Sequence, residues 1–326
     1  MHKRFVNHCT IDINLIPKGP VLIKSGKEGA DPTKPDMEFV ETYHAGGRSI
    51  YFPGSSLKGA IRAHAERIVR TIGSDRRPAN LDPTEGEARP LWASDPLDRE
   101  SYKYIEKEKD SQKVYRWSSF TDQLFGSVAI ASRLRIEDAY PADPQQVKTE
   151  ERNGVAIDRV FGSVAVGPFN YQVCTAGEFQ TKIHLKNFTL EQLGLLGLIL
   201  RDLNDGWFGL GFAKSRGMGL VEVKLNQATV DYPGCILKDG QICLLVSRDL
   251  HWPQSELIGA GAFFKDDAER QRYGFPAEDT QSTPVTAQEM AYGLGVQLTW
   301  AEGQVDDLFT RAVTAWRSRL MEGVAS

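Results

Sequence analysis

A turn of small and hydroxyl-bearing residues, Pro53-Gly54-Ser55-Ser56, leads into an apolar-periodic segment. The start of a helix presents free backbone N–H groups, and the two serine hydroxyls add donors, so this turn can bind an anion such as a phosphate. Lys58 and Arg62, four residues apart on one helix face, add positive charge. The spacing of a nucleotide-triphosphate loop is absent. An ordinary capped helix with solvated basic residues is the alternative interpretation.

The glycine-rich turn at residues 209–219 is a second stretch whose residues could bind a ligand. Its four glycines allow another backbone to approach closely, and Lys214, Ser215 and Arg216 between them can hold phosphates. The following residues partly match the strand signature of an RNA-recognition motif, but Met218 and Val223 stand where stacking aromatic residues would be. The turn therefore favours contact with a nucleic-acid backbone over base stacking.

The elements that must position these turns follow from hydrophobic periodicity. A helix is expected from Leu57 to Ile72, capped by Ser55 or Ser56 and ended by Gly73. A second helix follows a capping box at residues 189–192. Strands are predicted at residues 9–15, 132–140, 179–185 and 220–223, and a short helix at 120–126. The order strand, helix, strand, twice over, predicts an α+β ferredoxin-like core with long insertions.

Length and composition limit the class of protein. The 326 residues suit two modest domains or one large one, and no apolar run approaches the ~20 residues of a membrane span. The start of the chain lacks the apolar stretch of a secretory signal, so a cytoplasmic location without a membrane partner is expected. Four scattered cysteines argue against a disulfide framework and a structural zinc site. The net charge of −4 gives no hint of a nucleic-acid partner.

The domain organisation is predicted from changes in composition. Residues 1–230 hold the core, with a charged, largely solvated insertion at about 74–113 and a glycine-containing excursion at about 148–172. Residues 231–326 form a C-terminal extension with a hairpin around 238–241 and a terminal amphipathic helix. Trp316 on that helix is expected in the core or at a subunit contact.

In combination, these stretches resemble a known family. The sequence is similar to RAMP-superfamily subunits of type III CRISPR effector complexes, and in particular to the backbone subunits that polymerise along the guide RNA. The resemblance covers about residues 9–225 and is carried by the order and spacing of Phe52-Pro53-Gly54-Ser55-Ser56-Leu57-Lys58-Gly59, Leu124-Phe125-Gly126-Ser127, residues 132–140, Ala156-Ile157-Asp158-Arg159, Ala176-Gly177-Glu178-Phe179 and the turn at 209–219.

The resemblance implies a ferredoxin-like, RNA-recognition-motif-like core and a thumb hairpin, at about 148–172, that wedges into the duplex of guide and target. The implied partners are the guide RNA, single-stranded target RNA and other type III effector subunits. The expected RNA-binding residues are Ser55, Ser56, Lys58, Arg62, Arg133, Arg135, Arg152, Arg159, Lys214, Ser215 and Arg216.

In target-cleaving members, an aspartate in the loop before the Pro-Gly-Ser-Ser turn cuts target RNA with a divalent metal such as Mg²⁺. Asp36 stands closest to that place and is the candidate metal ligand, with Asp31 and Glu38 as alternatives because the loop is long. His44 is a candidate acid–base group in the same loop. A loop carboxylate without a role remains the alternative interpretation.

One segment departs from the family pattern. Several relatives carry paired cysteines before the Leu-Phe-Gly, whereas residues 117–123 contain none, so no zinc is predicted. Apolar packing through Trp117, Phe120 and Phe125 is expected to fasten the segment instead. Two other functions stay open: a non-catalytic structural RNA-binding subunit, and a metal-independent endoribonuclease that processes repeat RNA.

Overall fold

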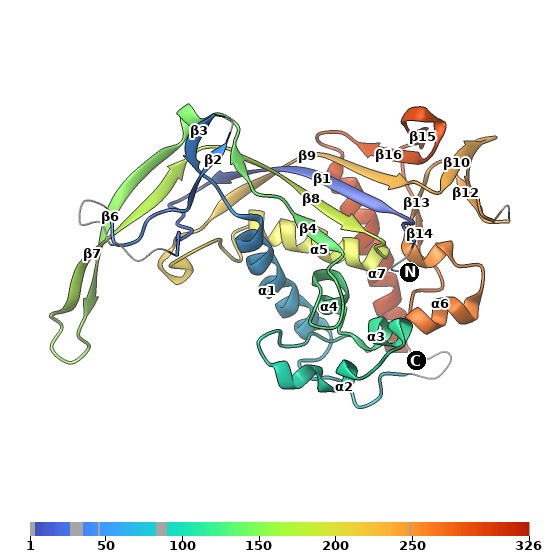
Figure 1. The fold of residues 1–326 in the computed structure, drawn as a ribbon, viewed down its shortest axis with the longest axis horizontal. Coiled ribbons are helices and arrows are strands. Elements are labelled where there is room, and N and C mark those ends of the chain that lie inside the picture. Colours follow the sequence, from blue (N-terminus) through green and yellow to red (C-terminus); the bar gives the residue numbers. More distant parts are fainter. Residues whose placement is uncertain (1–3, 27–34, 45, 83–89, 248, 326) are drawn as a thin grey trace.

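The computed structural model describes residues 4–26, 35–44, 46–82, 90–247 and 249–325. Its centre is an antiparallel sheet in the strand order β9-β1-β8-β4, which in chain order is fourth, first, third, second (Figure 1). With one helix after the first strand and one after the third, this is the ferredoxin-like topology. The predicted fold class is confirmed. The core elements are β1 (His8–Pro17), α1 (Gly54–Ile72), β4 (Leu134–Ile136), β8 (Phe179–Lys186), α5 (Leu190–Asn204) and β9 (Val221–Tyr232).

Helices cover only one face of the sheet. Because successive side chains of a strand point to opposite faces, the residues of each strand alternate between buried and partly exposed. In β1 the residues Cys9, Ile11 and Ile13 are buried, and Ile11 is paired with Ile183 of β8. The intervening Thr10 and Asp12 are partly exposed. Helices α1 and α5 lie together against one side of the sheet in Figure 1, so polar side chains are left on the other.

The first helix begins differently from the prediction. Pro53 occupies the N-cap position, and Ser55 and Ser56 lie inside the first turn with exposed side chains that make no cap. The Gly54 N–H donates to Asp138 Oδ1 at 2.7 Å instead. Only glycine fits at position 54, because a Cβ there would lie 2.2 Å from the Ile136 carbonyl oxygen. The end of α1 at Gly73 and the capping box of α5 are confirmed.

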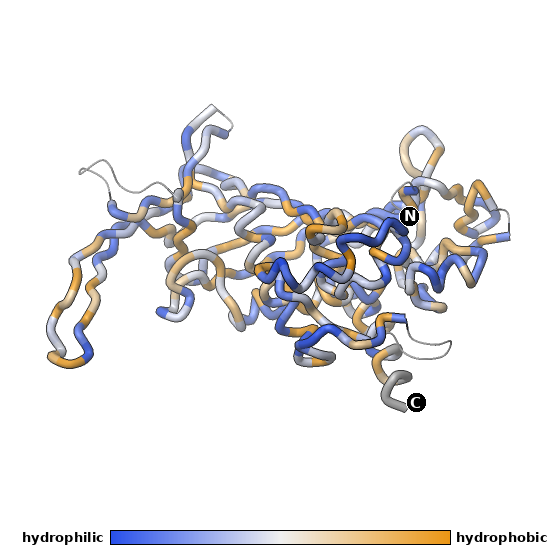
Figure 2. Tube along the Cα trace, turned by 60° about the horizontal axis from the view of Figure 1, so that its bottom comes forward, coloured by the Kyte–Doolittle hydropathy of each residue, from blue (hydrophilic) through white to orange (hydrophobic). Residues whose placement is uncertain are grey.

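The predicted thumb is a two-stranded hairpin of β6 (Lys148–Ile157) and β7 (Val164–Ala176) that extends away from the body of the molecule (Figure 1). The far end of the hairpin is coloured as hydrophobic in Figure 2. Val160 and Phe161 in the turn of this hairpin are 82% and 83% exposed. Apolar side chains at an exposed hairpin tip have no partner within this chain's core, which is typical of an element that contacts another molecule.

The insertion at 74–113 is more firmly anchored than a solvated segment. In its described part, Trp92, Tyr102 and Ile105 are buried, so the charge-rich composition concealed residues that pack inward. Phe120 and Phe125 are buried as expected. The short helices of this region are η1 (Arg99–Tyr102), α2 (Lys103–Glu106), α3 (Ser111–Trp117) and α4 (Phe120–Phe125).

The C-terminal extension completes the core. Strand β16 (Val296–Trp300) pairs with β9, and the terminal helix α7 (Val305–Ala325) packs on α5 so closely that a Cβ at Gly194 would lie 2.9 Å from the Ala312 carbonyl oxygen. Trp316 is buried and stacks on Phe120, which makes it a core residue.

The remaining elements include the predicted hairpin, which is β10–β11, and short pieces around the core. These are β2 (Glu41–His44), β3 (Gly47–Ile50), β5 (Tyr140–Pro141), η2 (Pro144–Gln146), η3 (Lys214–Arg216), β10 (Cys235–Lys238), β11 (Gln241–Leu244), β12 (His251–Pro253), β13 (Glu256–Ile258), η4 (Ala260–Phe263), α6 (Asp267–Tyr273), β14 (Thr280–Ser282), β15 (Gln288–Glu289) and η5 (Ala291–Gly293).

Candidate nucleic-acid interface

The segment at residues 20–25 joins the thumb to the glycine-rich turn. Val21 exchanges two backbone hydrogen bonds with Cys174 of β7, at 2.9 and 2.8 Å. On its other side, the Phe212 N–H donates to the Leu22 carbonyl oxygen at 2.7 Å, and the Gly219 N–H donates to that of Pro20 at 2.8 Å. Two stretches far apart in the sequence are therefore held next to each other by the first loop of the chain.

The same segment holds the stretch that carries Asp36. The Val40 N–H donates to the Ile23 carbonyl oxygen at 2.9 Å, and the Ser25 N–H donates to that of Glu38 at 3.1 Å. The thumb base, the glycine-rich turn and the Asp36 stretch thus share one backbone junction.

Asp36 lies against the middle of the thumb hairpin, where Asn170 of β7 pairs with Asn153 of β6. Its exposed carboxylate accepts a hydrogen bond through Oδ2 from the Asn170 N–H of β7, at 2.8 Å. The next residue, Met37, donates to the Asn170 carbonyl oxygen at 3.2 Å and accepts from the Gln172 N–H at 3.0 Å. Two further backbone bonds therefore fix the position of Asp36. Asp31 lies outside the described residues.

His44 has different neighbours from Asp36. It ends β2, and its exposed ring stacks on Tyr140 with a centroid distance of 3.7 Å and an interplanar angle of 6°. Asp36 instead contacts Asn170 of the thumb. The structure does not bring His44 to Asp36, so it does not support an acid–base role for this histidine at that carboxylate.

The glycine-rich turn presents its cations to solvent. Lys214, Ser215 and Arg216 form η3 and are exposed. The Phe212 ring beside them lies under the Lys24 ammonium at 4.2 Å and the Arg216 guanidinium at 5.5 Å. Sequence reasoning missed Lys24 and Phe212. A lysine that ends the apolar run Val21-Leu22-Ile23 was the available signal, but its position over Phe212 depends on the tertiary fold.

The start of α1 is a weaker anion site than predicted. The Gly54 N–H donates a hydrogen bond to the Asp138 carboxylate, which therefore lies where a phosphate was expected. Ser55 and Ser56 keep exposed side chains. The Lys58 ammonium donates to Ser132 Oγ at 2.8 Å. Partial burial, and then the nearby Arg62, lower the pKa of Lys58.

Arg62 is a correction to the predicted RNA-binding set. Its guanidinium donates to Glu66 Oε1 at 2.9 Å, to the Gly126 carbonyl oxygen at 2.8 Å and to Asp122 Oδ1 at 2.8 Å. Burial lowers the pKa of Arg62, but the Glu66 hydrogen bond and the Asp122 carboxylate outweigh it and raise the pKa overall. This side chain is committed to an internal ion-pair network.

Arg133 is a second correction, for a similar reason. It is only 7% exposed, donates to the Asn187 carbonyl oxygen at 2.5 Å and stacks over the Tyr115 ring at 4.1 Å. Burial lowers its pKa, and Tyr115 offsets part of the shift. Arg135 lies two residues further on, inside β4, where it alternates with the buried Leu134 and Ile136, so its side chain is exposed and contacts Glu137 at 3.1 Å.

The thumb keeps both of its predicted cations accessible. Arg152 on β6 is 44% exposed and bonds to Glu150 beside it, and Arg159 is exposed in the turn. Their placement leaves them available to a partner along the hairpin.

For a divalent metal, the candidate residues in the described structure offer a single protein ligand. Among the residues that the structure describes, no three histidine, cysteine, aspartate or glutamate side chains gather in one place. Asp36 can supply one oxygen, and Mg²⁺ commonly keeps several waters and takes further oxygens from phosphates. The chain alone therefore offers no complete metal site in its described part.

Comparison with protein families decides the class of the molecule. The model of the RAMP superfamily matches residues 15–222, which is more than half of the chain and includes the Asp36 stretch, α1, the thumb and the glycine-rich turn. The chain belongs to the RAMP superfamily. It is thereby a CRISPR-associated RNA-binding protein. A search of curated proteins finds no match. No helix in the described parts of this RAMP protein is long and apolar enough to cross a membrane.

Two neighbouring arginines of this RAMP protein should respond to alanine in opposite ways. Arg133→Ala is expected to destabilise the fold by about 2–4 kcal/mol, because it leaves the Asn187 carbonyl oxygen and the Tyr115 ring face without their partner. Arg135→Ala is expected to leave thermal unfolding unchanged and to weaken RNA binding several-fold. Thermal unfolding and RNA titration of both variants check this, and a reversed pattern would show that the burial assignment is wrong.

The glycine-rich turn should supply sequence-independent affinity. The double variant Lys214→Ala/Arg216→Ala is expected to weaken RNA binding about tenfold and to reduce the slope of log affinity against log salt by about 1, because fewer counterions are released. Titration at several salt concentrations measures both effects. Arg272→Ala is the matched control, since Arg272 is exposed and belongs to α6, which lies at the opposite end of the molecule from the thumb (Figure 1). An unchanged slope in the double variant would remove the turn from the RNA path.

Proposed function

We propose that this RAMP protein is a backbone subunit of a type III CRISPR effector complex that binds the guide RNA and cleaves complementary target RNA through Asp36. The observation that carries the proposal is the position of Asp36 against the thumb hairpin, where the Asn170 N–H of β7 donates to its carboxylate at 2.8 Å. A hairpin that enters the duplex of guide and target would deliver the target strand next to this carboxylate.

The distribution of charge supports the RNA-binding part of the proposal. The net charge of −4 is an average over surfaces of different charge. At the glycine-rich turn the local charge is positive, since Lys214 and Arg216 lie in the turn and Lys24 lies over its Phe212 ring. Arg152 and Arg159 add cations along the thumb, whose tip ends in the exposed Val160 and Phe161. Local charge of this kind decides where a phosphate backbone lies, whatever the total.

The chemistry supports cleavage by the 2′-hydroxyl of the RNA itself. That reaction needs in-line geometry, a proton acceptor near the hydroxyl and positive charge near the scissile phosphate. Asp36 has an exposed carboxylate that can accept the proton, and its position is fixed by backbone bonds to β7. Lys24 forms an isolated β-bridge with Phe39, three residues from Asp36, so it places a cation on the same backbone junction. A bound Mg²⁺, held by Asp36 and RNA phosphates, would supply charge neutralisation.

The test uses the complex assembled with its guide RNA. Target RNA is expected to be cut at regular intervals with Mg²⁺ and to stay intact in EDTA. Full guide binding without any cutting in Mg²⁺ would identify the structural subunit instead. Cleavage of isolated repeat RNA by the single chain in EDTA would identify a repeat-processing endoribonuclease, and either result would overturn the proposal.

A further inference from the structure

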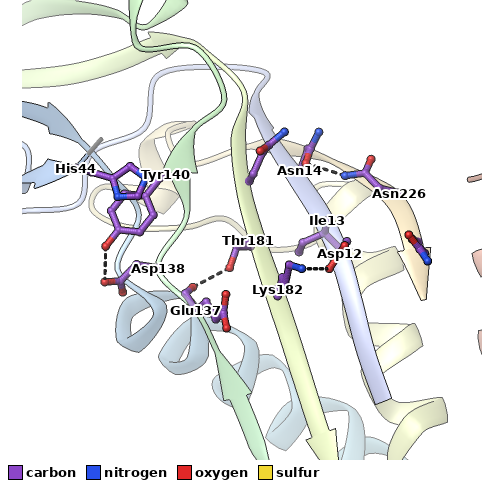
Figure 3. Close-up of a pocket in the computed structure, with 12 residues that line it drawn as sticks. Asp12, Ile13, Asn14, His44, Glu137, Asp138, Tyr140, Thr181, Lys182 and Asn226 are labelled. Carbon is purple, nitrogen blue, oxygen red and sulfur yellow. Dashed lines mark hydrogen bonds and ion pairs between the residues drawn. The ribbon is translucent and has the colours of Figure 1, made fainter. Parts of the chain in front are cut away.

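The uncovered face of the sheet carries a pocket of about 550 Å³ that the proposed function does not use (Figure 3). It lies across β8, β1 and β9 and is bordered by the chain between β4 and β5 and by the β2–β3 hairpin. Asp12 stands between the buried Ile11 and Ile13, so its side chain points away from the helices and into this polar face. The volume is of the size that holds one nucleoside.

Two stacked rings form one wall of the pocket. His44 lies over Tyr140 with nearly parallel rings, and Tyr51 continues the stack at 5.7 Å and 16° from Tyr140. The Tyr140 hydroxyl donates to Asp138 Oδ2 at 3.3 Å, and Asp138 is itself fixed by the Gly54 N–H at the start of α1. Since His44 is exposed, the stack ends in an aromatic ring that a further flat group can cover.

The floor of the pocket is formed by amide and carboxylate side chains. Pairing between strands places Tyr140 opposite Gln180, and Gln180 opposite Asn14, so one row leads from the rings to the amides. Asn14 accepts a hydrogen bond from Asn226 Nδ2 at 2.8 Å (Figure 3). The Asp12 carboxylate lies one row further along, and Lys182 Nζ is 3.6 Å from its Oδ1. Among the described residues Asp12 Oδ1 is buried and accepts no hydrogen bond, so it is an acceptor in need of a donor.

The charge of the lining decides which part of an RNA can enter. The lining has three carboxylates, on Asp12, Glu137 and Asp138, against the single ammonium of Lys182. A phosphate would be repelled, whereas an uncharged base with amino hydrogens would find acceptors. Carboxylates accept hydrogen bonds from the exocyclic amino groups of bases, and aromatic side chains stack on any base.

From these features we infer that the pocket binds one unpaired nucleobase with an exocyclic amino group, stacked on His44 and hydrogen-bonded to Asp12. This inference rests on the proposed RNA binding and adds a base preference to it. The glycine-rich turn and the thumb hold phosphates and duplex without reading the sequence, while this pocket favours adenine, cytosine or guanine over uracil at one position.

The first test compares short single-stranded RNAs made only of A, C or U in titrations with the full chain. The wild-type protein is expected to bind the A and C oligonucleotides about fivefold more tightly than the U oligonucleotide. His44→Ala is expected to lower affinity for the A oligonucleotide about tenfold, and Asp12→Asn to remove the preference over U. Tyr43→Ala is the matched control, because Tyr43 precedes His44 in β2, is 81% exposed and does not line the pocket.

The second test uses free adenosine and uridine, which carry no phosphate, followed by NMR titration at millimolar concentration. Saturable adenosine binding that His44→Ala abolishes is expected, with thermal unfolding confirming that the variant is folded. If His44→Ala and Asp12→Asn both bind RNA with unchanged base preference, and adenosine does not bind, the inference that the pocket binds a base would be overturned. The proposed function would remain. His44-dependent adenosine binding by a chain that binds no oligonucleotide would keep the pocket and overturn the proposed function.

Discussion

Asp36→Asn is expected to reduce target-RNA cleavage by the assembled complex about 100-fold or more while guide-RNA binding changes less than twofold. Asparagine keeps an oxygen that can accept the 2.8 Å hydrogen bond from the Asn170 N–H, so the contact with the thumb stays intact. It removes the negative charge and therefore both the proton acceptor and the metal ligand. Single-turnover cleavage of labelled target RNA in Mg²⁺, together with a guide-binding titration, measures the two effects separately.

Three further variants show which carboxylate matters. Asp36→Ala removes the hydrogen bond as well as the charge, so it should match Asp36→Asn in cleavage if the charge is decisive. Glu38→Gln and Asp31→Asn are the comparison variants and are expected to retain cleavage. Wild-type cutting by Asp36→Asn, with loss in either comparison variant, would move the catalytic role to that residue. Unchanged cutting in all of them would assign cleavage to another subunit.

Asp122→Ala is expected to be the most destabilising single substitution among those considered, at about 3–5 kcal/mol. Asp122 is fully buried and accepts hydrogen bonds from Arg62 at 2.8 Å, Ser94 at 2.6 Å and Ser119 at 2.8 Å. Its removal leaves the Arg62 guanidinium with one fewer carboxylate and two buried hydroxyls without their acceptor. For a chain of this size the loss corresponds to a fall in Tm of about 10 °C.

Glu66→Gln is the matched control for Asp122. Glu66 also pairs with Arg62, at 2.9 Å, but the amide oxygen of glutamine can still accept that hydrogen bond, so a loss below about 1 kcal/mol is expected. Thermal and urea unfolding of both variants measure the difference. Equal stability of Asp122→Ala and the wild type would show that Asp122 does not anchor this segment.

This network also explains how the segment lacking cysteines is held. Apolar packing was expected there, and Phe120 and Phe125 do pack inward. A second anchor is polar, because Tyr102 of the charge-rich insertion and Arg62 of α1 both donate to the Asp122 carboxylate. A buried carboxylate with several donors fastens α4 to two neighbouring elements, and no local pattern in the sequence indicates those partners.

The local elements follow from residues that are close together in the chain. Caps, stops and periodicity act between residues about four positions apart, which is why the capping box at Thr189 and the end of α1 at Gly73 were predicted correctly. The thumb hairpin was expected from the family resemblance, and the pairing of β6 with β7 agrees with it. The order of these elements predicted the ferredoxin-like core, and the order and spacing of the quoted motifs carried the resemblance to the family. The glycine-rich turn was also predicted, because its glycines and cations are neighbours in the chain.

Only the tertiary structure decided which charged groups are available. Arg62 and Arg133 have the same residue type as Arg135 and Arg216, yet the first two are turned inward by partners 54 to 64 residues away in sequence. Asp138, rather than either serine, meets the start of α1, and Lys24 reaches Phe212 across the fold. Burial and ion pairing depend on contacts between distant segments, so a residue's type shows what chemistry it can do, and the packing around it decides whether it is free to do so.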